Sequence, residues 1–299
     1  MSEQNITHDM DPYEKSCILK AGKIGKAALE FAQTLIEPGV LLLDVAEKTE
    51  TFIRQEGAQP SFPLNLSINH EAAHYTPFPN DKKTFKTGDL VKVDIGAQVD
   101  GFISDNAATV EVGGTGNYSN LIDSSREALE AALKVLRPNI PIGLIGRVIG
   151  DKINSMGFKP VKNLGGHGIN RFDLHSRIFI PNYDDGNGAT ITPGTVIAIE
   201  PFASTGTGMI HNGPGGNIYI MSGTKQDKRD PVYGAFNMLP FAERWITSLI
   251  PDHSAYLRKM MGKKQISQFP VLKEHNGAMI SQAEHTILVL ADEIIVTTK

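Results

Sequence analysis

The stretch that most constrains the fold is residues 90–105, LVKVDIGAQVDGFISD. Apolar residues alternate on both sides of a turn near 99–101, which predicts a β-hairpin. Asp94 lies on the first arm and Asp105 on the second. A turn at 99–100 would place Asp94 directly opposite Asp105. A turn at 100–101 would place Asp94 opposite Ala107, with both acids still on one face.

Both registers bring two carboxylates together on an apolar hairpin. Two like charges in such a place repel, and one would have to be neutralised unless a cation lay between them. The hairpin therefore predicts a metal site.

The composition is typical of a soluble globular protein. The chain has 299 residues, 40% apolar and 21% charged, enough for one large domain or two modest ones. A net charge of −4 gives no basic surface for nucleic acid or anionic membranes, so we expect binding to neither DNA nor membrane. A single cysteine, Cys17, a polar start and the absence of a long apolar run predict a cytoplasmic protein.

The first third of the chain resembles the second. Helical periodicity runs through residues 12–36, and Asp44 with Glu47 predicts a capping box for a second helix that ends at Gly57. Another helical pair is expected at 119–137 and 143–156. Residues 28–60 align with residues 128–160 without a gap, and their proline and glycine stops coincide. Two amphipathic helix pairs can match by chance, but the coincident stops favour an internal duplication.

The duplication predicts two further acids. The first half reads TGDLVKVD up to Asp94, and the second reads PGTVIAIE up to Glu200. Glu284 precedes a returning strand, as Asp105 does, but the spacing from Glu200 to Glu284 is 84 residues instead of 11. This difference indicates an insertion, which we interpret as a charged, mostly helical subdomain at 219–277 with helices at 235–245 and 251–261.

Four strand-borne acids would converge if the two halves packed about a pseudo-twofold axis. Each acid alone could be a solvated surface carboxylate, but Asp94 and Glu200 end apolar strands, where an unpartnered carboxylate is costly. His167, in the glycine-rich LGGHGI at 164–169, is either a loop histidine or a ligand. Four carboxylates and one imidazole suit a pair of Mn, Fe, Co or Zn ions. From spacing alone, His74 and His175 are as consistent with ordinary core or surface histidines as with site residues.

Several separated motifs, in order, resemble methionine aminopeptidases of type 2, and the likeness covers the chain from about Pro12 to its end. The chain has no long charged N-terminal extension and so is similar to the archaeal forms. The motifs are NHEAAHYTP (69–77), DIGAQVDGFISD (94–105), GGHGI (165–169), LHS (174–176), IEPF (199–202) and QAEHT (282–286).

The resemblance implies an α/β (α+β) pita-bread fold, with two duplicated halves around a curved, mainly antiparallel sheet. We expect a flexible lead at 1–11, a catalytic domain at 12–218 and 278–299, and the insert at 219–277. It also implies a hydrolase that removes the initiator methionine from nascent proteins with a small second residue, through a hydroxide that bridges two metal ions. We expect a monomer whose partners are the N-terminal methionine of nascent polypeptides and the ribosome.

The same resemblance implies roles for individual residues. Two divalent ions would be held by Asp94, Asp105, His167, Glu200 and Glu284. Glu200 would also handle the proton of the bridging water, His74 would bind or protonate the scissile amide, and His175 would hold the substrate carbonyl. The methionine side chain would be held by Phe62, Leu174, Ile218 and Phe269.

Two other functions share this pattern. A pita-bread peptidase that cleaves before proline would use the same metals, but such enzymes usually carry an extra N-terminal domain. A non-enzymatic relative that binds protein or RNA would have lost ligands, whereas all five positions here are suitable.

Overall fold

The computed structural model describes residues 10–222 and 227–299, so the expected flexible lead at 1–11 lies almost entirely outside the described residues. Within the described residues, no helix has both the length and the apolar character needed to cross a lipid bilayer. Described structure begins with a helix whose start is fixed by Asp11, since its carboxylate accepts a hydrogen bond of 2.7 Å from the backbone N–H of Tyr13.

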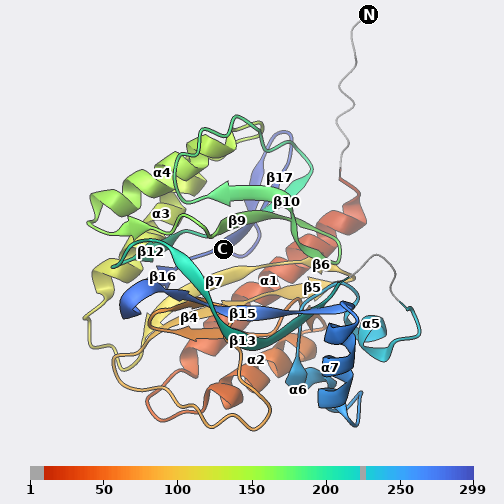
Figure 1. Cartoon of the computed structure of the whole chain (residues 1–299). Coiled ribbons are helices and arrows are strands. Elements are labelled where there is room, and N and C mark those ends of the chain that lie inside the picture. The colour runs from red at the N-terminus through yellow and green to blue at the C-terminus, as the bar shows by residue number, and fades with distance from the viewer. Residues whose placement is uncertain (1–9, 223–226) are drawn as a thin grey trace, which may run out of the picture.

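The first half of the chain contains two helices followed by short strands (Figure 1). The elements are α1 (Pro12–Thr34), α2 (Leu42–Gln55), β1 (Gln59–Pro60), β2 (Asn65–Ile68), β3 (Glu71–Ala73), β4 (Leu90–Ile95), β5 (Ala97–Val99), β6 (Phe102–Ile103) and β7 (Asn106–Glu111).

The second half repeats this order and is then interrupted. It contains α3 (Ser119–Val135), α4 (Ile142–Ser155), β8 (Lys159–Pro160), β9 (Gly165–Asn170), β10 (Asp173–Pro181), β11 (Thr195–Ile199) and β12 (Phe202–Ser204). The interruption holds β13 (Ile210–Met221), α5 (Pro231–Phe236), β14 (Phe241–Ala242), α6 (Glu243–Ile246), α7 (His253–Gly262), β15 (Ile266–Glu274) and the 3-10 turn η1 (His275–Gly277). The chain ends with β16 (Ile280–Gln282), β17 (His285–Val289) and β18 (Ile294–Val296).

The predicted duplication is present in strand pairing as well as in element order. The sheet β2-β4-β7 of the first half corresponds to the order β9-β11-β17 in the second. Pro60 pairs with Ala97, and one hundred residues later Pro160 pairs with Ala203. All these ladders are antiparallel. The mixed helix and strand content and the curled antiparallel sheets confirm the predicted fold class.

The opening hairpin adopts the second of its two predicted registers. Gln98 pairs with Ile103 and Asp94 with Ala107, so the turn is Asp100-Gly101. Both turn residues have positive φ, 51° and 82°, which a two-residue hairpin turn of this twist requires.

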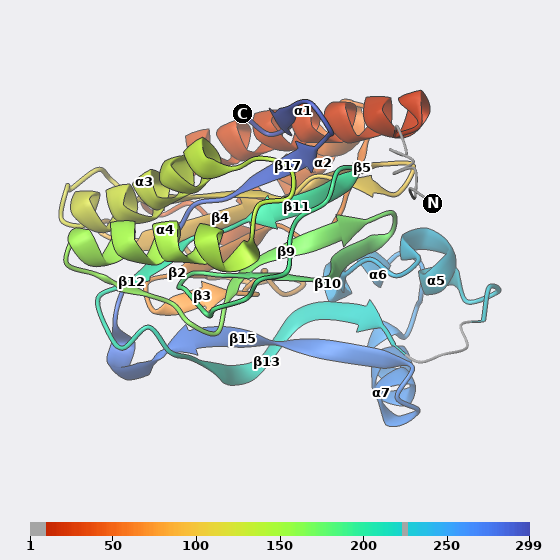
Figure 2. The ribbon, with the colours of Figure 1, turned by 90° about the horizontal axis from the view of Figure 1, so that it is seen from above.

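In each half of the chain, two helices pack against the strands and form a separate hydrophobic core with them. Ile24, Ala28 and Ile53 of α1 and α2 pack with Val91 and Val93 of β4. In the second half, α3 and α4 pack in the same way against β11 and β17. The β13–β15 pair lies on the other side of these strands, with α5 to α7 grouped at one end (Figure 2).

The two halves meet along β7 and β17. Glu284 and Ala107 form an isolated antiparallel bridge, with the Glu284 N–H donating to the Ala107 carbonyl at 2.9 Å. The Thr286 hydroxyl accepts from the backbone N–H of Asp105 and donates to its carbonyl, both at 2.7 Å. This junction fixes Asp105 of one half beside Glu284 of the other.

Three local predictions were wrong. The capping box at Asp44 does not form: α2 begins at Leu42, and its N-cap, Leu41, makes no side-chain hydrogen bond. The helix expected at 235–245 is broken into α5 and α6, because Pro240 cannot donate within a helix. The region 219–277 is also less helical than predicted, because Ile266–Glu274 forms a strand that pairs with β13.

A buried ion pair connects this region to the first half. Arg244 of α6 contacts Glu50 of α2, and their side chains are only 4% and 2% exposed. Glu50 also accepts hydrogen bonds from the Trp245 indole N–H at 2.7 Å and from the Leu64 backbone N–H at 3.1 Å. Glu50 therefore holds α6 and the β1–β2 connection together.

We predict that Arg244→Met lowers the free energy of unfolding by about 3–5 kcal/mol, because it leaves the Glu50 carboxylate buried without its cation. Urea denaturation followed by circular dichroism measures the change. The matched control is Arg229→Met, whose side chain is 91% exposed in its pair with Asp227 and should contribute less than about 1 kcal/mol. Equal effects of the two substitutions would contradict the assignment.

Candidate metal centre and active site

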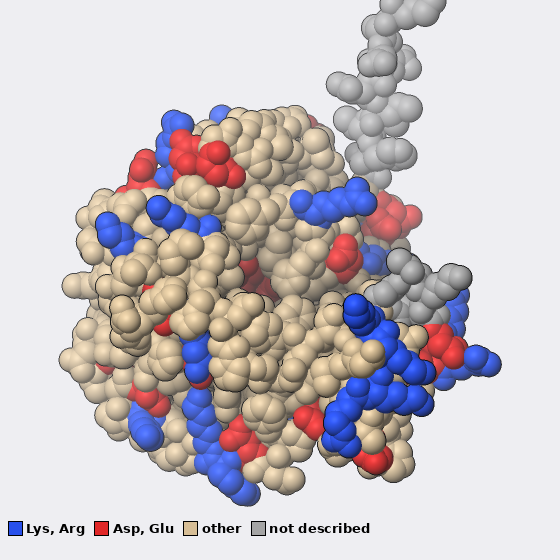
Figure 3. Space-filling view, viewed as in Figure 1, with Lys and Arg blue, Asp and Glu red and all other residues tan. Residues whose placement is uncertain are grey.

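Four acidic side chains meet where the chain passes from a strand of one sheet to a strand of another. Asp94 lies in β4 just before β5, and Asp105 lies between β6 and β7. Glu200 lies between β11 and β12, and Glu284 between β16 and β17. The acids lie at the bottom of a hollow in the molecular surface, where Figure 3 shows acidic atoms deep near the centre of the face.

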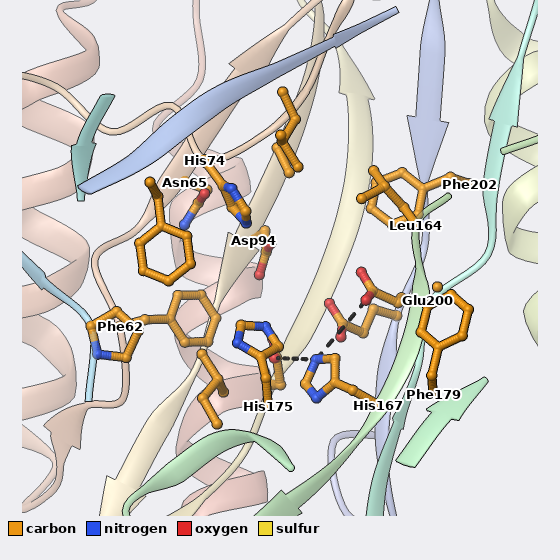
Figure 4. Close-up of a pocket in the computed structure, with 18 of the residues that line it drawn as sticks. Phe62, Asn65, His74, Asp94, Leu164, His167, His175, Phe179, Glu200 and Phe202 are labelled. Atoms are coloured by element: carbon orange, nitrogen blue, oxygen red, sulfur yellow. Dashed lines mark ion pairs between the residues drawn. The ribbon is translucent and has the colours of Figure 1, made fainter. Parts of the chain in front are cut away.

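His167 joins this group from β9. Its Nε2 lies 3.5 Å from Asp105 Oδ2 and 3.9 Å from Glu200 Oε1, as the dashed lines in Figure 4 mark. One ligand atom from each of Asp105, His167 and Glu284 lies within 4.8 Å of the other two. The glycine beside His167 allows β9 to lie close to β11: a Cβ on Gly166 would lie 2.3 Å from the Ala198 carbonyl oxygen.

The acidic group fits divalent metal ions. Asp94 Oδ1, Asp105 Oδ1 and Glu284 Oε1 are buried and have no hydrogen-bond partner among the described residues. Burial, followed by the neighbouring carboxylates, raises the pKa of Asp94, Glu200 and Glu284 well above the ordinary range. Burial also raises the pKa of Asp105, to about 7. Divalent cations would supply the charge and the contacts that these oxygens lack.

Three imidazoles border the acids and are held neutral. Burial lowers the pKa of His167 and of His74 to about 4. Burial and the neighbouring His167 lower the pKa of His175 to about 3. The His175 ring lies edge-on to His167, with centroids 4.4 Å apart, and His175 lines the hollow above the acids. A neutral imidazole can ligate a metal or donate an N–H at neutral pH.

An apolar cavity of about 330 Å³ opens above the acids. All four residues of the expected methionine pocket line it: Phe62 from the β1–β2 connection, Leu174 from β10, Ile218 from β13 and Phe269 from β15. His74 follows β3 with a φ of 67°, and its ring lies edge-on to Phe269 at 5.1 Å. The left-handed backbone at His74 is a strained conformation of the kind that concentrates at functional sites.

Comparisons with known proteins agree with this geometry. Residues 16–230 match the model of metallopeptidase family M24. The chain is 42% identical over 298 residues to the methionine aminopeptidase of Methanocaldococcus jannaschii, covering 97% of this chain and all of that one. The chain belongs to family M24, among its methionine aminopeptidases. It is a metal-dependent hydrolase.

Solved structures of M24 peptidases share the fold. The methionine aminopeptidase of Thermotoga maritima matches with a TM-score of 0.73 at 26% identity, covering 98% of this chain and all of that one. The prolidase of Pyrococcus furiosus matches with a TM-score of 0.63 at 19% identity. The match covers 99% of this chain and 66% of the prolidase chain. The second likeness shows the fold alone.

Sequence reasoning missed one polar residue in the centre of this M24 peptidase. The Gln282 amide nitrogen lies 3.3 Å from Glu200 Oε2 and 3.4 Å from Glu284 Oε2, so it can donate to both. Its backbone is held in turn by the Thr109 hydroxyl, at 2.7 Å. Gln282 precedes Glu284 by two residues, and strand alternation could have placed the two on one face.

We predict that Asp105→Asn stabilises the metal-free protein, and that the gain grows with pH. The pKa of Asp105 is raised in the folded state, so the folded chain holds a proton there that the unfolded chain loses above about pH 4. Stability of the wild type is therefore lost as pH rises towards 7, and asparagine avoids this loss. In urea titrations with a chelator present, Asp105→Asn and wild type should have the same free energy of unfolding at pH 4. At pH 8 the free energy of unfolding of Asp105→Asn should be higher by on the order of 2 kcal/mol.

With Mn²⁺ added at pH 8, wild type should instead be more stable than Asp105→Asn, because asparagine lacks the anionic oxygen that a cation would use. A difference between the two chelated proteins that stays constant from pH 4 to 8 would contradict the prediction.

Proposed function

We propose that this M24 peptidase removes the initiator methionine from new polypeptides with a small second residue. One observation carries the proposal: a set of buried, uncompensated carboxylates forms the floor of an apolar cavity. Its walls suit a thioether side chain, which packs well against aliphatic and aromatic groups. The substrate N-terminus and first peptide bond would then lie over the acids.

Two divalent ions would be held by Asp94, Asp105, His167, Glu200 and Glu284, and Mn, Fe, Co and Zn all accept this ligand set. Such ions polarise a carbonyl and make a nearby water more acidic. The identity and the number of the ions belong to the proposal.

The chain's own residues position the substrate and move protons. The Glu200 carboxylate, with its raised pKa, can accept a proton from the attacking water. Neutral His175 can donate an N–H to the carbonyl oxygen as negative charge develops there. Neutral His74, beside Phe269, can donate to the nitrogen of the scissile amide.

The domain division also belongs to the proposal. Residues 12–218 and 278–299 would form the catalytic domain, and residues 219–277 would be an insert that supplies Phe269 to the cavity. Monomeric state, contact with the ribosome and a cytoplasmic location stay predictions from the sequence.

We predict that His175→Ala lowers kcat by about 10²–10³ while metal affinity is kept, because His175 would act on the substrate and not on the ions. His167→Ala should instead lose metal affinity. Isothermal titration with Mn²⁺ and steady-state assays distinguish the two. The matched control is His211→Ala, whose side chain is exposed on β13 and which should keep both properties.

A peptide assay tests the function itself. Metal-loaded protein should release methionine from Met-Ala-Ser and should not cleave an Xaa-Pro dipeptide, and chelation should stop the release. Cleavage of the Xaa-Pro peptide alone would identify a proline-specific peptidase. Metal binding without hydrolysis of either peptide would identify a binding protein.

A further inference from the structure

Arg177 lies at the edge of the cavity and has no role in the proposed mechanism. It lies on β10, two residues after His175, and lines the same cavity. Figure 4 shows His175 and Phe179, two residues before and after it, on either side of His167. Arg177 is the one lysine or arginine among the described residues that line this cavity.

The guanidinium of Arg177 has no partner among residues 10–222 and 227–299. It is exposed, and no hydrogen bond or ion pair joins it to any described residue. Other exposed arginines near this hairpin are paired: Arg171 lies 2.6 Å from Asp100, and Arg147 lies 2.6 Å from Asp184. An arginine fork left open at a binding cavity is suited to a carboxylate that arrives from outside.

The backbone at Arg177 is built to present this side chain. Ser176 pairs with Gly168 and Phe179 with His167, so Arg177 and Ile178 form an extra segment without a partner on β9. Such bulges re-aim side chains and are frequent beside active sites. Ile178 packs partly against the core formed with α3 and α4 and also lines the cavity, so Arg177 is the polar member of the bulge.

We propose that Arg177 is a specificity-determining residue that binds a carboxylate of the substrate beyond its second residue. The inference rests on the proposed function, in which the N-terminal methionine fills the cavity and the rest of the peptide leaves past its edge. An extended peptide advances about 3.3 Å per residue, so the third or fourth residue passes the cavity edge. Peptides with aspartate or glutamate there are preferred.

The experiment compares amidated peptides that differ only in charge. Metal-loaded protein is assayed on Met-Ala-Asp-Gly-NH₂, Met-Ala-Gly-Asp-NH₂, Met-Ala-Gly-Gly-NH₂ and Met-Ala-Lys-Gly-NH₂. One acidic peptide should have a KM about three-fold lower than the neutral one, as for a solvent-accessible ion pair, with little change in kcat. The unamidated Met-Ala-Gly-Gly separates a terminal carboxylate from a side-chain carboxylate. High salt should reduce the preference.

Substitutions assign the preference to one side chain. Arg177→Gln should abolish the ratio between acidic and neutral peptides, Arg177→Lys should keep part of it, and Arg177→Glu should favour the lysine peptide. Arg171→Gln, on the same hairpin but outside the cavity, should leave the ratio unchanged. Methionine release at equal KM from all the peptides would overturn this inference and leave the proposed function intact. No methionine release from any of them would overturn the proposed function.

Discussion

The crowding of four carboxylates, of which Asp105 and Glu284 are buried and Asp94 and Glu200 half-buried, is the constraint on which the rest of the structure depends. Desolvation raises the pKa of every one of these acids, and repulsion from the neighbouring carboxylates raises it further for Asp94, Glu200 and Glu284. A fold that keeps such a group together must compensate elsewhere, and here two complete hydrophobic cores do so, one beneath each half-sheet. The energetic cost of holding the carboxylates together also favours metal binding, because a site that is unfavourable without cations binds them strongly.

The duplication explains how the acids come together. Each of the four lies where the chain passes between two sheets. At such a point the chain bends, and small residues permit the bend: a Cβ on Gly96 would lie 1.9 Å from the Ser104 carbonyl oxygen. The bridge between Ala107 and Glu284 then joins the halves at this level. One solution to a local bend, used twice, therefore builds the centre.

The sequence was most informative where a pattern was repeated. The 90–105 hairpin limited the register to two choices, and the turn chemistry of Asp100-Gly101 decided between them. Glu200 was predicted from the duplication, because residues 28–60 recur at 128–160, before the resemblance was considered. Tertiary contacts that leave no local pattern were missed. Gln282 acquires its function from carboxylates on other strands, and the start of α2 is set by packing of Leu42 and not by the Asp44 side chain.

The interrupting segment adds apolar walls to a cavity whose acids come from the duplicated halves. Ile218, Phe269 and Leu272 line the cavity from β13 and β15. Leu272 pairs with Ala73, the residue before His74, so β15 also supports the strained backbone of that histidine. A substitution on β15 can therefore affect substrate fit and the orientation of His74 together. Part of the apolar wall therefore comes from a segment that carries none of the four acids.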